Sequence, residues 1–357
     1  MKILLLAGEE SGVLYADRLR RTPELASAEI RGYGDYGFAT ADLAVFGITA
    51  VLKRIFFFLR VKRVMCQAIR EWRPDVVCTI DYPGMNLKLA AYAHTLGIRT
   101  VHVVCPQVWA WKAGRIPKIE AILDRLCCFF PFEPALFRPG LADWVGHPLV
   151  AEFAGKHAPE PRLVAALPGS RLGEIRRHLP ILLESLSQLR DVYVEIPAAN
   201  GRAEAEIKSI LAQHPVQFPL RVTSGGAEAL LLRAEVAVVA SGTATLQAAL
   251  ARCPTVLVYR VEPILAWFLR RAITGVRHVG LANIIWEKAG GTGVAPMPEL
   301  LQENFTAAAV TDYLAKWLDD PAAREEIRSR LSKAVRLLEK EGDPIRNIAC
   351  DILGEGK

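Results

Sequence analysis

The sequence predicts an α/β fold with two parallel, doubly wound sheets, and three observations support this prediction. Short apolar runs alternate with amphipathic helical patterns along most of the chain, as in layered strands and helices. The alternation breaks once, near residues 150–162, and then restarts. The chain of 357 residues is also too long for one ordinary domain. We therefore expect Rossmann-like domains at 1–155 and 156–340, and a C-terminal helix in 341–357 that could pack back on the first domain.

The first half predicts six strands and four helices. The strands are expected near 2–7, 28–32, 75–80, 99–104, 126–130 and 142–145. The helices are expected near 11–21, 49–72, 85–96 and 115–123. The opening apolar run is read as a buried strand and not as a secretion signal, because Glu9 and Glu10 cut it short.

The second half repeats the pattern. Strands are expected near 162–167, 191–196, 219–223, 235–240 and 254–259. Helices are expected near 171–189, 202–213, 226–233, 243–251 and 262–273, and only helix beyond about Thr306. We expect the two sheets to face each other across a cleft. Ligands of such sheets bind at the carboxyl ends of the strands, so we expect the ligand sites there.

Composition excludes several classes of protein. No apolar run approaches the roughly 20 residues that span a bilayer. The seven cysteines form no CxxC pair and show no zinc spacing with histidine, so we predict no metal site and expect reduced, mostly buried thiols. The net charge of +6 is modest and dispersed, which fits an anionic ligand or an anionic membrane surface but not nucleic acid.

One strand-to-helix turn has the composition of an anion site. Gly169 and Ser170 separate a predicted strand from a helix that opens at Arg171. Gly169 has no Cβ, so a phosphate oxygen could approach the backbone, and the N–H groups at the helix start point outward. Arg171 adds a planar fork of donors that suits a diphosphate. An ordinary βα turn with a surface arginine is the alternative.

A second turn of the same design favours the phosphate interpretation. Ser241, Gly242 and Thr243 also follow a predicted strand and open a helix, which adds two hydroxyls to the backbone N–H groups. Gln247 lies one helical turn further on, within reach of a sugar or ribose. Two such turns in one sheet are hard to explain by chance.

Further candidates follow strands of the first half. Asp81 is expected at the carboxyl end of a buried strand, where it is either a turn acid or a general base. Glu10 and Ser11 follow the first strand, Trp109 follows a later one, and His147 follows the last. For Glu10 and Ser11 the structural and ligand interpretations are equally supported, Trp109 is either a core aromatic or part of a cleft wall, and a lone histidine such as His147 is more often structural than catalytic. A G-x-G-x-x-G match at 32–37 is rejected as a dinucleotide site, because it follows the second strand and not the first.

Residues 48–63 predict a helix that lies on a membrane surface. Cations flank an apolar stripe that contains three consecutive phenylalanines, which is typical of interfacial helices. The predicted membrane contacts are Leu52, Ile55, Phe56, Leu59 and Arg60, with Phe57 and Phe58 widening the stripe. The alternative is that these side chains pack inside the domain. Residues 265–271 show a similar pattern.

Motifs along nearly the whole chain resemble those of one family. They are GEESG at 8–12, DYP at 81–83 with Asn86, PQVWAW at 106–111, PFE at 131–133, GHP at 146–148, LPGSR at 167–171, SGTATL at 241–246, Asn283, and PELLQ at 298–302. In combination they resemble the bacterial lipid-A-disaccharide synthases, inverting glycosyltransferases of the two-domain GT-B architecture.

The resemblance implies a reaction and a location. Such an enzyme joins UDP-diacylglucosamine to diacylglucosamine 1-phosphate, releases UDP, needs no metal or other cofactor, and works as a peripheral protein on the cytoplasmic face of the inner membrane. An oligomer is compatible with the resemblance.

The resemblance also implies residue roles. Asp81 would deprotonate the acceptor hydroxyl, and Arg171 with Gly169 and Ser170 would hold the diphosphate. Three further residues, Asn283, Glu299 and Gln302, would line the nucleotide pocket with the turn at 241–243. The acceptor side would be lined by Glu10, Ser11, Asn86, Trp109 and His147.

Three positions depart from the family pattern. Val13 and Gly84 stand where the family usually has Asp, and Gln247 stands where it has Glu. These changes leave open two alternatives to the synthase: another UDP-sugar enzyme, such as a 2-epimerase or a transferase with a soluble acceptor, and a UDP-sugar-binding protein without turnover. A divergent enzyme is the preferred interpretation, because Asp81 and Arg171 are both present.

Overall fold

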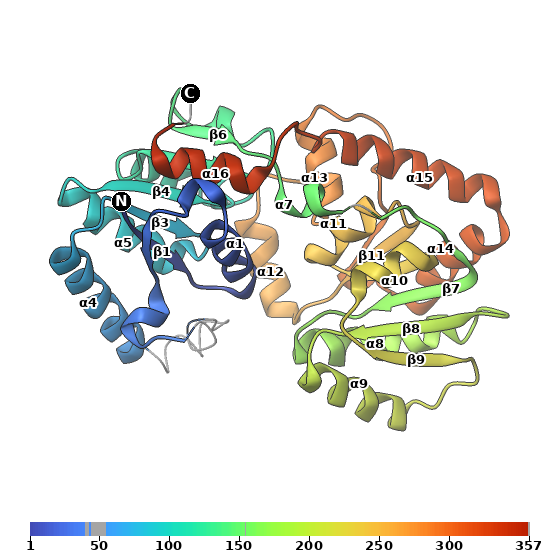
Figure 1. Ribbon diagram of the computed structural model, residues 1–357. Coiled ribbons are helices and arrows are strands. Elements are labelled where there is room, and N and C mark those ends of the chain that lie inside the picture. Colours follow the sequence, from blue (N-terminus) through green and yellow to red (C-terminus); the bar gives the residue numbers. More distant parts are fainter. Residues whose placement is uncertain (40–42, 44–54, 154, 356–357) are drawn as a thin grey trace. The chain divides into compact units, whose positions relative to one another are not determined.

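The computed structural model describes residues 1–39, 43, 55–153 and 155–355, and it divides into two compact units. The first unit is Met1–Ala151 together with Lys340–Lys357, and the second is Glu152–Glu339. Each unit is an α/β layered structure with its own sheet (Figure 1).

The first unit contains a six-stranded sheet in the order β2-β1-β3-β4-β5-β6, with every pairing parallel. The strands are β1 (Lys2–Ala7), β2 (Glu29–Arg31), β3 (Val76–Ile80), β4 (Arg99–Val103), β5 (Arg125–Cys128) and β6 (Ala142–Trp144). The helices are α1 (Glu10–Arg20), α4 (Ile55–Trp72), α5 (Pro83–Thr95), α6 (Ile116–Glu120), α7 (Pro148–Glu152) and α16 (Pro344–Leu353). Residue Glu152 of α7 is already part of the second unit.

Helices on both faces of this sheet explain the unbroken apolar sequence of β1. Ile3 and Leu5 pack in a core with α1 and α16, whereas Leu4 and Leu6 pack in another with α4 and α5. Successive side chains of a strand point to opposite faces, so a strand covered on both sides must be apolar throughout.

The C-terminal helix α16 is tied to the first unit by a buried ion pair. Arg125 Nη2 on β5 lies 2.5 Å from Asp351 Oδ1 on α16, and both side chains are mostly buried. Arg99 on β4 also donates to the Asp351 carbonyl, at 3.0 Å. The last helix therefore completes a core whose other elements come from the first half of the chain.

The second unit contains a six-stranded parallel sheet in the order β12-β11-β10-β7-β8-β9. The strands are β7 (Glu160–Leu167), β8 (Tyr193–Ala198), β9 (Leu220–Ser224), β10 (Ala234–Ala240), β11 (Thr255–Tyr259) and β12 (Glu299–Leu301). The helices are α8 (Leu172–Leu186), α9 (Gly201–Gln213), α10 (Ala227–Arg233), α11 (Thr243–Leu250), α12 (Pro263–Ala272), α13 (Leu281–Lys288), α14 (Ala307–Asp319) and α15 (Pro321–Arg336). One core joins the sheet to α8, α9 and α14, while α11, α13 and α15 pack against one another.

The predicted α/β fold of two domains is confirmed, with differences in detail. Three elements were not predicted: the short helix α7, the three-residue strand β12 and the helix α13. Strand β7 begins at Glu160, two residues before its predicted start, because Pro161 and Arg162 form a bulge in which proline is tolerated. The predicted helix at 49–72 is observed from Ile55, and its first six residues lie outside the described part.

A buried histidine makes the first unit sensitive to acid. His102 on β4 is fully buried, and its Nδ1 lies 2.7 Å from the Thr79 hydroxyl. Burial lowers the pKa of His102 to about 3. Below pH 6.5 the unfolded chain binds a proton at this residue that the folded chain does not, so the unfolding free energy decreases as the pH falls.

We expect the variant His102→Asn to remove part of this pH dependence. Between pH 6.5 and 4.5 the unfolding free energy of the native sequence should decrease by about 2 kcal/mol more than that of the variant. Urea unfolding followed by circular dichroism measures both values. The exposed His94→Asn serves as the control and should behave like the native sequence. Equal pH dependence in all three proteins would contradict this role of His102.

Candidate active site

A pocket in the second unit lies at the carboxyl ends of two neighbouring strands, β7 and β10. Its volume is about 320 Å³, and its wall comes from the turns that follow these strands. The predicted residues in this wall are Gly169, Ser170, Arg171, Ser241, Gly242, Thr243 and Gln247. The two turns that the sequence singled out therefore line one pocket, with the N-terminal ends of α8 and α11 beside it.

The turn after β7 depends on a glycine. Gly169 has φ +118°, and a Cβ at this position would lie 2.6–2.7 Å from the Glu174 side chain. Glu174 is buried and accepts a hydrogen bond from Arg171 Nη1 at 2.9 Å. Glu174 therefore folds back over the turn and fixes Arg171 at the start of α8, which is possible only with glycine at position 169.

A histidine that the sequence analysis missed supports the same turn. His178 on α8 is fully buried; its Nδ1 lies 2.8 Å from the Pro168 carbonyl, and Arg260 N donates to its Nε2 at 3.0 Å. A neutral ring with the proton on Nδ1 satisfies both contacts, and burial lowers the pKa of His178. The available signal was its position on the apolar stripe of α8, between Ile175 and Leu182.

The turn after β10 has an open backbone. Gly242 has φ +153°, and nothing lies within 4 Å of the place where its Cβ would be. Thr245 donates through its hydroxyl to the Gly242 carbonyl at 2.8 Å, which fixes the first turn of α11. Gln247 is half-buried and reaches the pocket wall, as its spacing predicted.

Two of the residues expected beside the nucleotide, Asn283 and Glu299, form a separate network. Glu299 accepts hydrogen bonds from Val279 N, Gly280 N and Asn283 Nδ2, which stabilises the N-terminal end of α13. Asn283 is fully buried, so it acts through Glu299 and the backbone of Met297. None of these residues belongs to the wall of the 320 Å³ pocket.

Gln302 follows β12, and its amide is placed to pair with the backbone N–H and carbonyl of Val261. Its backbone carbonyl accepts from the Arg260 guanidinium at 2.9 Å. Gln302 is also absent from the pocket wall. A nucleotide contact by Glu299 or Gln302 stays a prediction.

In the first unit, Asp81 follows β3 in a strained conformation. Asp81 and Tyr82 both have positive φ, +48° and +51°, and Tyr82 N donates to Asp81 Oδ1 at 2.8 Å. Burial raises the pKa of the Asp81 carboxyl. A carboxylate with a raised pKa is a stronger base, which suits proton abstraction from a hydroxyl.

Asn86 positions Asp81 and does not itself line an open surface. It is fully buried on α5, and its Nδ2 lies 2.8–3.2 Å from the carbonyls of Leu6, Ile80 and Asp81. Its Oδ1 accepts from the Tyr33 hydroxyl at 2.7 Å. Asn86 therefore links the ends of β1 and β3, and the acceptor contact expected of it stays a prediction.

The other acceptor-side candidates occupy different environments. Trp109 and His147 are buried in an aromatic cluster with Phe130, and burial lowers the pKa of His147 to about 4. Trp109 Nε1 donates to Glu133 at 2.9 Å. Glu10 and Ser11 form the first residues of α1.

The structure shows the environments of the three residues that depart from the family pattern. Val13 on α1 packs partly against the core with α16. Gly84 lies exposed near the start of α5, with no atom within 4 Å of a Cβ there. Gln247 keeps its place in the pocket wall. Position 84 therefore has open space where the family usually carries a carboxylate.

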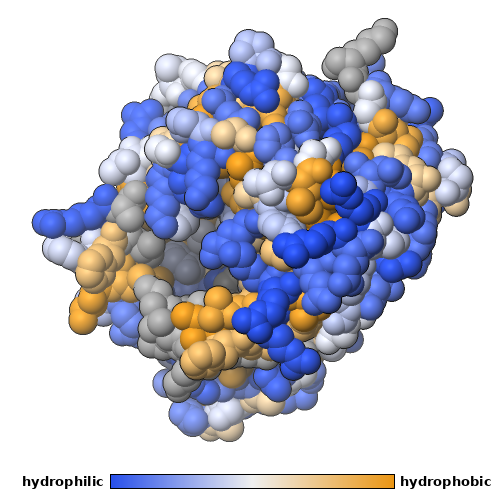
Figure 2. Space-filling view, turned by 90° about the vertical axis from the view of Figure 1, so that its left-hand side faces the viewer, coloured by the Kyte–Doolittle hydropathy of each residue, from blue (hydrophilic) through white to orange (hydrophobic). Residues whose placement is uncertain are grey.

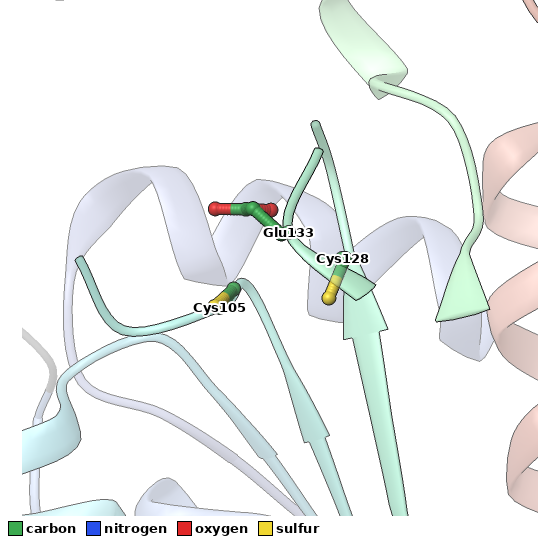
Figure 3. Close-up of side chains that lie close together, drawn as sticks. All are labelled: Cys105, Cys128 and Glu133. Atoms are coloured by element: carbon green, nitrogen blue, oxygen red, sulfur yellow. The ribbon is translucent and has the colours of Figure 1, made fainter. Parts of the chain in front are cut away.

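A cluster that the sequence did not predict lies at the ends of β4 and β5. Cys105, Cys128 and Glu133 are buried, and one ligand-type atom from each lies within 4.8 Å of the others (Figure 3). Their spacing matches no common metal motif, which is why they escaped notice. The seven cysteines, all in the described part, form no disulfide.

Helix α4 exposes part of its apolar stripe. Ile55, Phe56 and Leu59 are 44%, 82% and 57% exposed, and hydrophobic side chains gather at the surface on the side that carries α4 (Figure 2). Arg60 is exposed beside them. Leu52 lies outside the described residues.

Phe57 and Phe58 do not widen this stripe, contrary to the prediction. Both are half-buried and pack against the core under α4, with the Phe57 ring 6.1 Å from that of Phe38. Among the described residues, no helix has the length and apolar character needed to cross a bilayer.

Comparisons with known proteins identify one family. The family model described as lipid-A-disaccharide synthetase matches residues 3–344. The lipid-A-disaccharide synthase of Geobacter sulfurreducens is 32% identical, over 99% of this chain and 98% of the relative. That of Acidobacterium capsulatum is 36% identical, over 95% and 92%.

Solved structures support the fold. MurG of Acinetobacter baumannii superposes with a TM-score of 0.61 at 13% identity, covering 99% of both chains. The UDP-GlcNAc 2-epimerase of Neisseria meningitidis, bound to UDP-GlcNAc, superposes with a TM-score of 0.58 at 9% identity, covering 94% of this chain and 98% of the epimerase. The architecture is therefore the GT-B glycosyltransferase fold, and the chain belongs to the lipid-A-disaccharide synthase family of hexosyltransferases.

Proposed function

We propose that this chain joins UDP-diacylglucosamine to diacylglucosamine 1-phosphate, forming the lipid A disaccharide phosphate and releasing UDP. The observation that carries the proposal is the pocket in which two strand-to-helix turns and Arg171 converge. Family membership supports the reaction, and no observation in the pocket favours the epimerase or a protein without turnover.

The pocket would bind the diphosphate of the donor. The starts of α8 and α11 lie at the pocket, where helix N-terminal N–H groups attract anions, and the Arg171 guanidinium adds directed donors. Negative charge grows on the diphosphate as the glycosidic bond breaks, so these donors stabilise the transition state more than the ground state.

Asp81 would act as the general base. The acceptor hydroxyl gives its proton to the Asp81 carboxylate while its oxygen attacks the anomeric carbon, and UDP leaves from the opposite face. Asn86 and Tyr82 hold Asp81 for this step through the bonds described above. Direct displacement of this kind inverts the anomeric configuration.

The lipid chains of both substrates require access to a membrane. We propose that Ile55, Phe56 and Leu59 enter the headgroup boundary of the cytoplasmic face of the inner membrane, with Arg60 near its anionic lipids. An enzyme with a soluble acceptor has no need of this exposed apolar face. We expect a peripheral attachment, since three side chains provide reversible binding only.

We expect Asp81→Asn to abolish most turnover without loss of donor binding. The amide keeps the shape of the side chain but accepts no proton, so kcat should decrease by about 10²–10⁴. UDP release is measured with both lipid substrates present, and UDP affinity by calorimetry. The exposed Asp17→Asn on α1 is the control. Undiminished turnover in Asp81→Asn would remove Asp81 from the mechanism.

We expect Arg171 to contribute to UDP affinity. Because Arg171→Ala alone would leave the buried Glu174 without its partner, the test uses Arg171→Ala combined with Glu174→Gln, against Glu174→Gln alone. Calorimetry should show UDP affinity about 10- to 100-fold weaker in the double variant, the value of a charge-assisted hydrogen bond. The exposed Arg202→Ala should bind UDP normally. Equal affinity in the double variant and in Glu174→Gln would rule out the contact.

We expect Phe56→Ser with Leu59→Ser to weaken membrane binding by at least about tenfold, since each apolar side chain buried contributes roughly 1.5–3 kcal/mol. Cosedimentation with vesicles that contain phosphatidylglycerol measures the affinity, which should also decrease as salt is added. The exposed Val294→Ser in the second unit is the control. Unchanged, salt-independent binding of the double variant would contradict the assignment.

A further inference from the structure

Cys105, Cys128 and Glu133 come from three segments at one edge of the first sheet. Cys105 follows β4, Cys128 ends β5, and Glu133 lies in the loop after β5. Figure 3 shows the three side chains drawn together between these segments. Each residue is at most 3% exposed, so the cluster is shielded from solvent by the surrounding core.

The Glu133 carboxylate is buried without a cation. Its oxygens accept hydrogen bonds from Trp109 Nε1 and Phe130 N, but no Lys or Arg in the described part of the chain forms an ion pair with it. A buried carboxylate is costly unless a positive charge compensates it. The Phe129 backbone and the Cys105 thiol also contribute hydrogen bonds to this carboxylate, so a metal ion would take the place of the thiol proton between Cys105 and Glu133.

The two cysteines face this carboxylate on the same side of the sheet. Both belong to the core beneath α5 and α6, and the Cys105 thiol lies 3.3 Å from the Pro106 carbonyl. Val104, with φ +72°, turns the chain so that Cys105 leaves the β4 ladder toward Cys128. Two sulfur donors and one carboxylate oxygen thus converge on a small volume.

We propose that Cys105, Cys128 and Glu133 bind one Zn²⁺ ion at a structural site. Zinc accepts thiolate sulfur and carboxylate oxygen in a tetrahedral arrangement, whereas Mg²⁺ and Ca²⁺ require oxygen ligands. On binding, each thiol loses its proton to solvent and forms a sulfur–zinc bond. The charges of two thiolates and one carboxylate then exceed that of the ion by one, and a water or carbonyl takes the fourth position.

Such a site would stabilise the loops that follow β4 and β5. Glu133 already holds the Trp109 indole, and Cys105 lies in the segment that leads to this tryptophan. A metal bond at Glu133 and Cys105 would fix both segments together. The role is structural and independent of the glycosyl transfer proposed above.

Metal analysis of the intact protein tests the proposal. After reducing purification and loading with Zn²⁺, then removal of excess metal, the native sequence should retain one zinc per chain. Co²⁺ loading should give a thiolate-to-cobalt charge-transfer band. Cys105→Ser and Cys128→Ser should each lose this band and the retained zinc. Cys127→Ser, a neighbouring and equally buried cysteine in the core with α16, should keep both.

X-ray absorption on the native protein avoids any folding defect of the variants. The proposal requires sulfur scatterers at about 2.3 Å together with oxygen at about 2.0–2.2 Å. A chain that retains no zinc, a first shell of nitrogen and oxygen only, or equal zinc loss in Cys127→Ser would overturn it.

Discussion

The parallel direction of every strand pairing is the constraint on which both units depend. Parallel strands end at the same edge of their sheet, so the turns after them collect there, whatever their distance in sequence. In the second unit this rule has a direct effect, because β7 and β10 are neighbours. The turns that begin at Pro168 and Ser241 therefore line one pocket, although six helices and strands separate them along the chain.

Buried polar side chains keep these turns in place. Asn86 links Asp81 to the ends of two strands, His178 links the turn at Pro168 to Arg260, and Glu299 holds the N-terminal end of α13. Removing one of them would leave buried backbone groups without partners, at a cost of about 1–3 kcal/mol each. The loops are thus shaped before any ligand binds, which is the condition for efficient electrostatic stabilisation of a transition state.

The sequence predicted the strands well because a strand covered on both faces must be apolar, and such runs are visible without tertiary knowledge. It missed β12, which has three residues, and α13, whose start is fixed by Glu299 from a distant segment. The turns around Gly169 and Gly242 were predictable from local chemistry. The structural roles of the buried Asn86, Asn283 and His178 were not predictable. The sequence does not indicate whether an amide or imidazole is buried until its hydrogen-bond partners are known. The cluster of Cys105, Cys128 and Glu133 was not predictable either, because only the fold brings these three residues together.

The acidic side chain of Glu174 lies at the pocket proposed for an anion, and its position depends on Gly169. Glu174 is 8% exposed and pairs with Arg171, whose side chain is 57% exposed, so the pair brings little net positive charge to the pocket. The negative charge of Glu174 offsets part of the arginine's attraction for an anion, because the two charges act on the pocket with opposite sign. Attraction of an anion then depends on directed N–H bonds from the backbone of the two turns and from the guanidinium. Because Glu174 occupies the space that a Cβ at position 169 would need, the same contact that lowers the charge also fixes the geometry. Such a pocket would select the proposed diphosphate by the positions of its acceptor oxygens more than by its total charge.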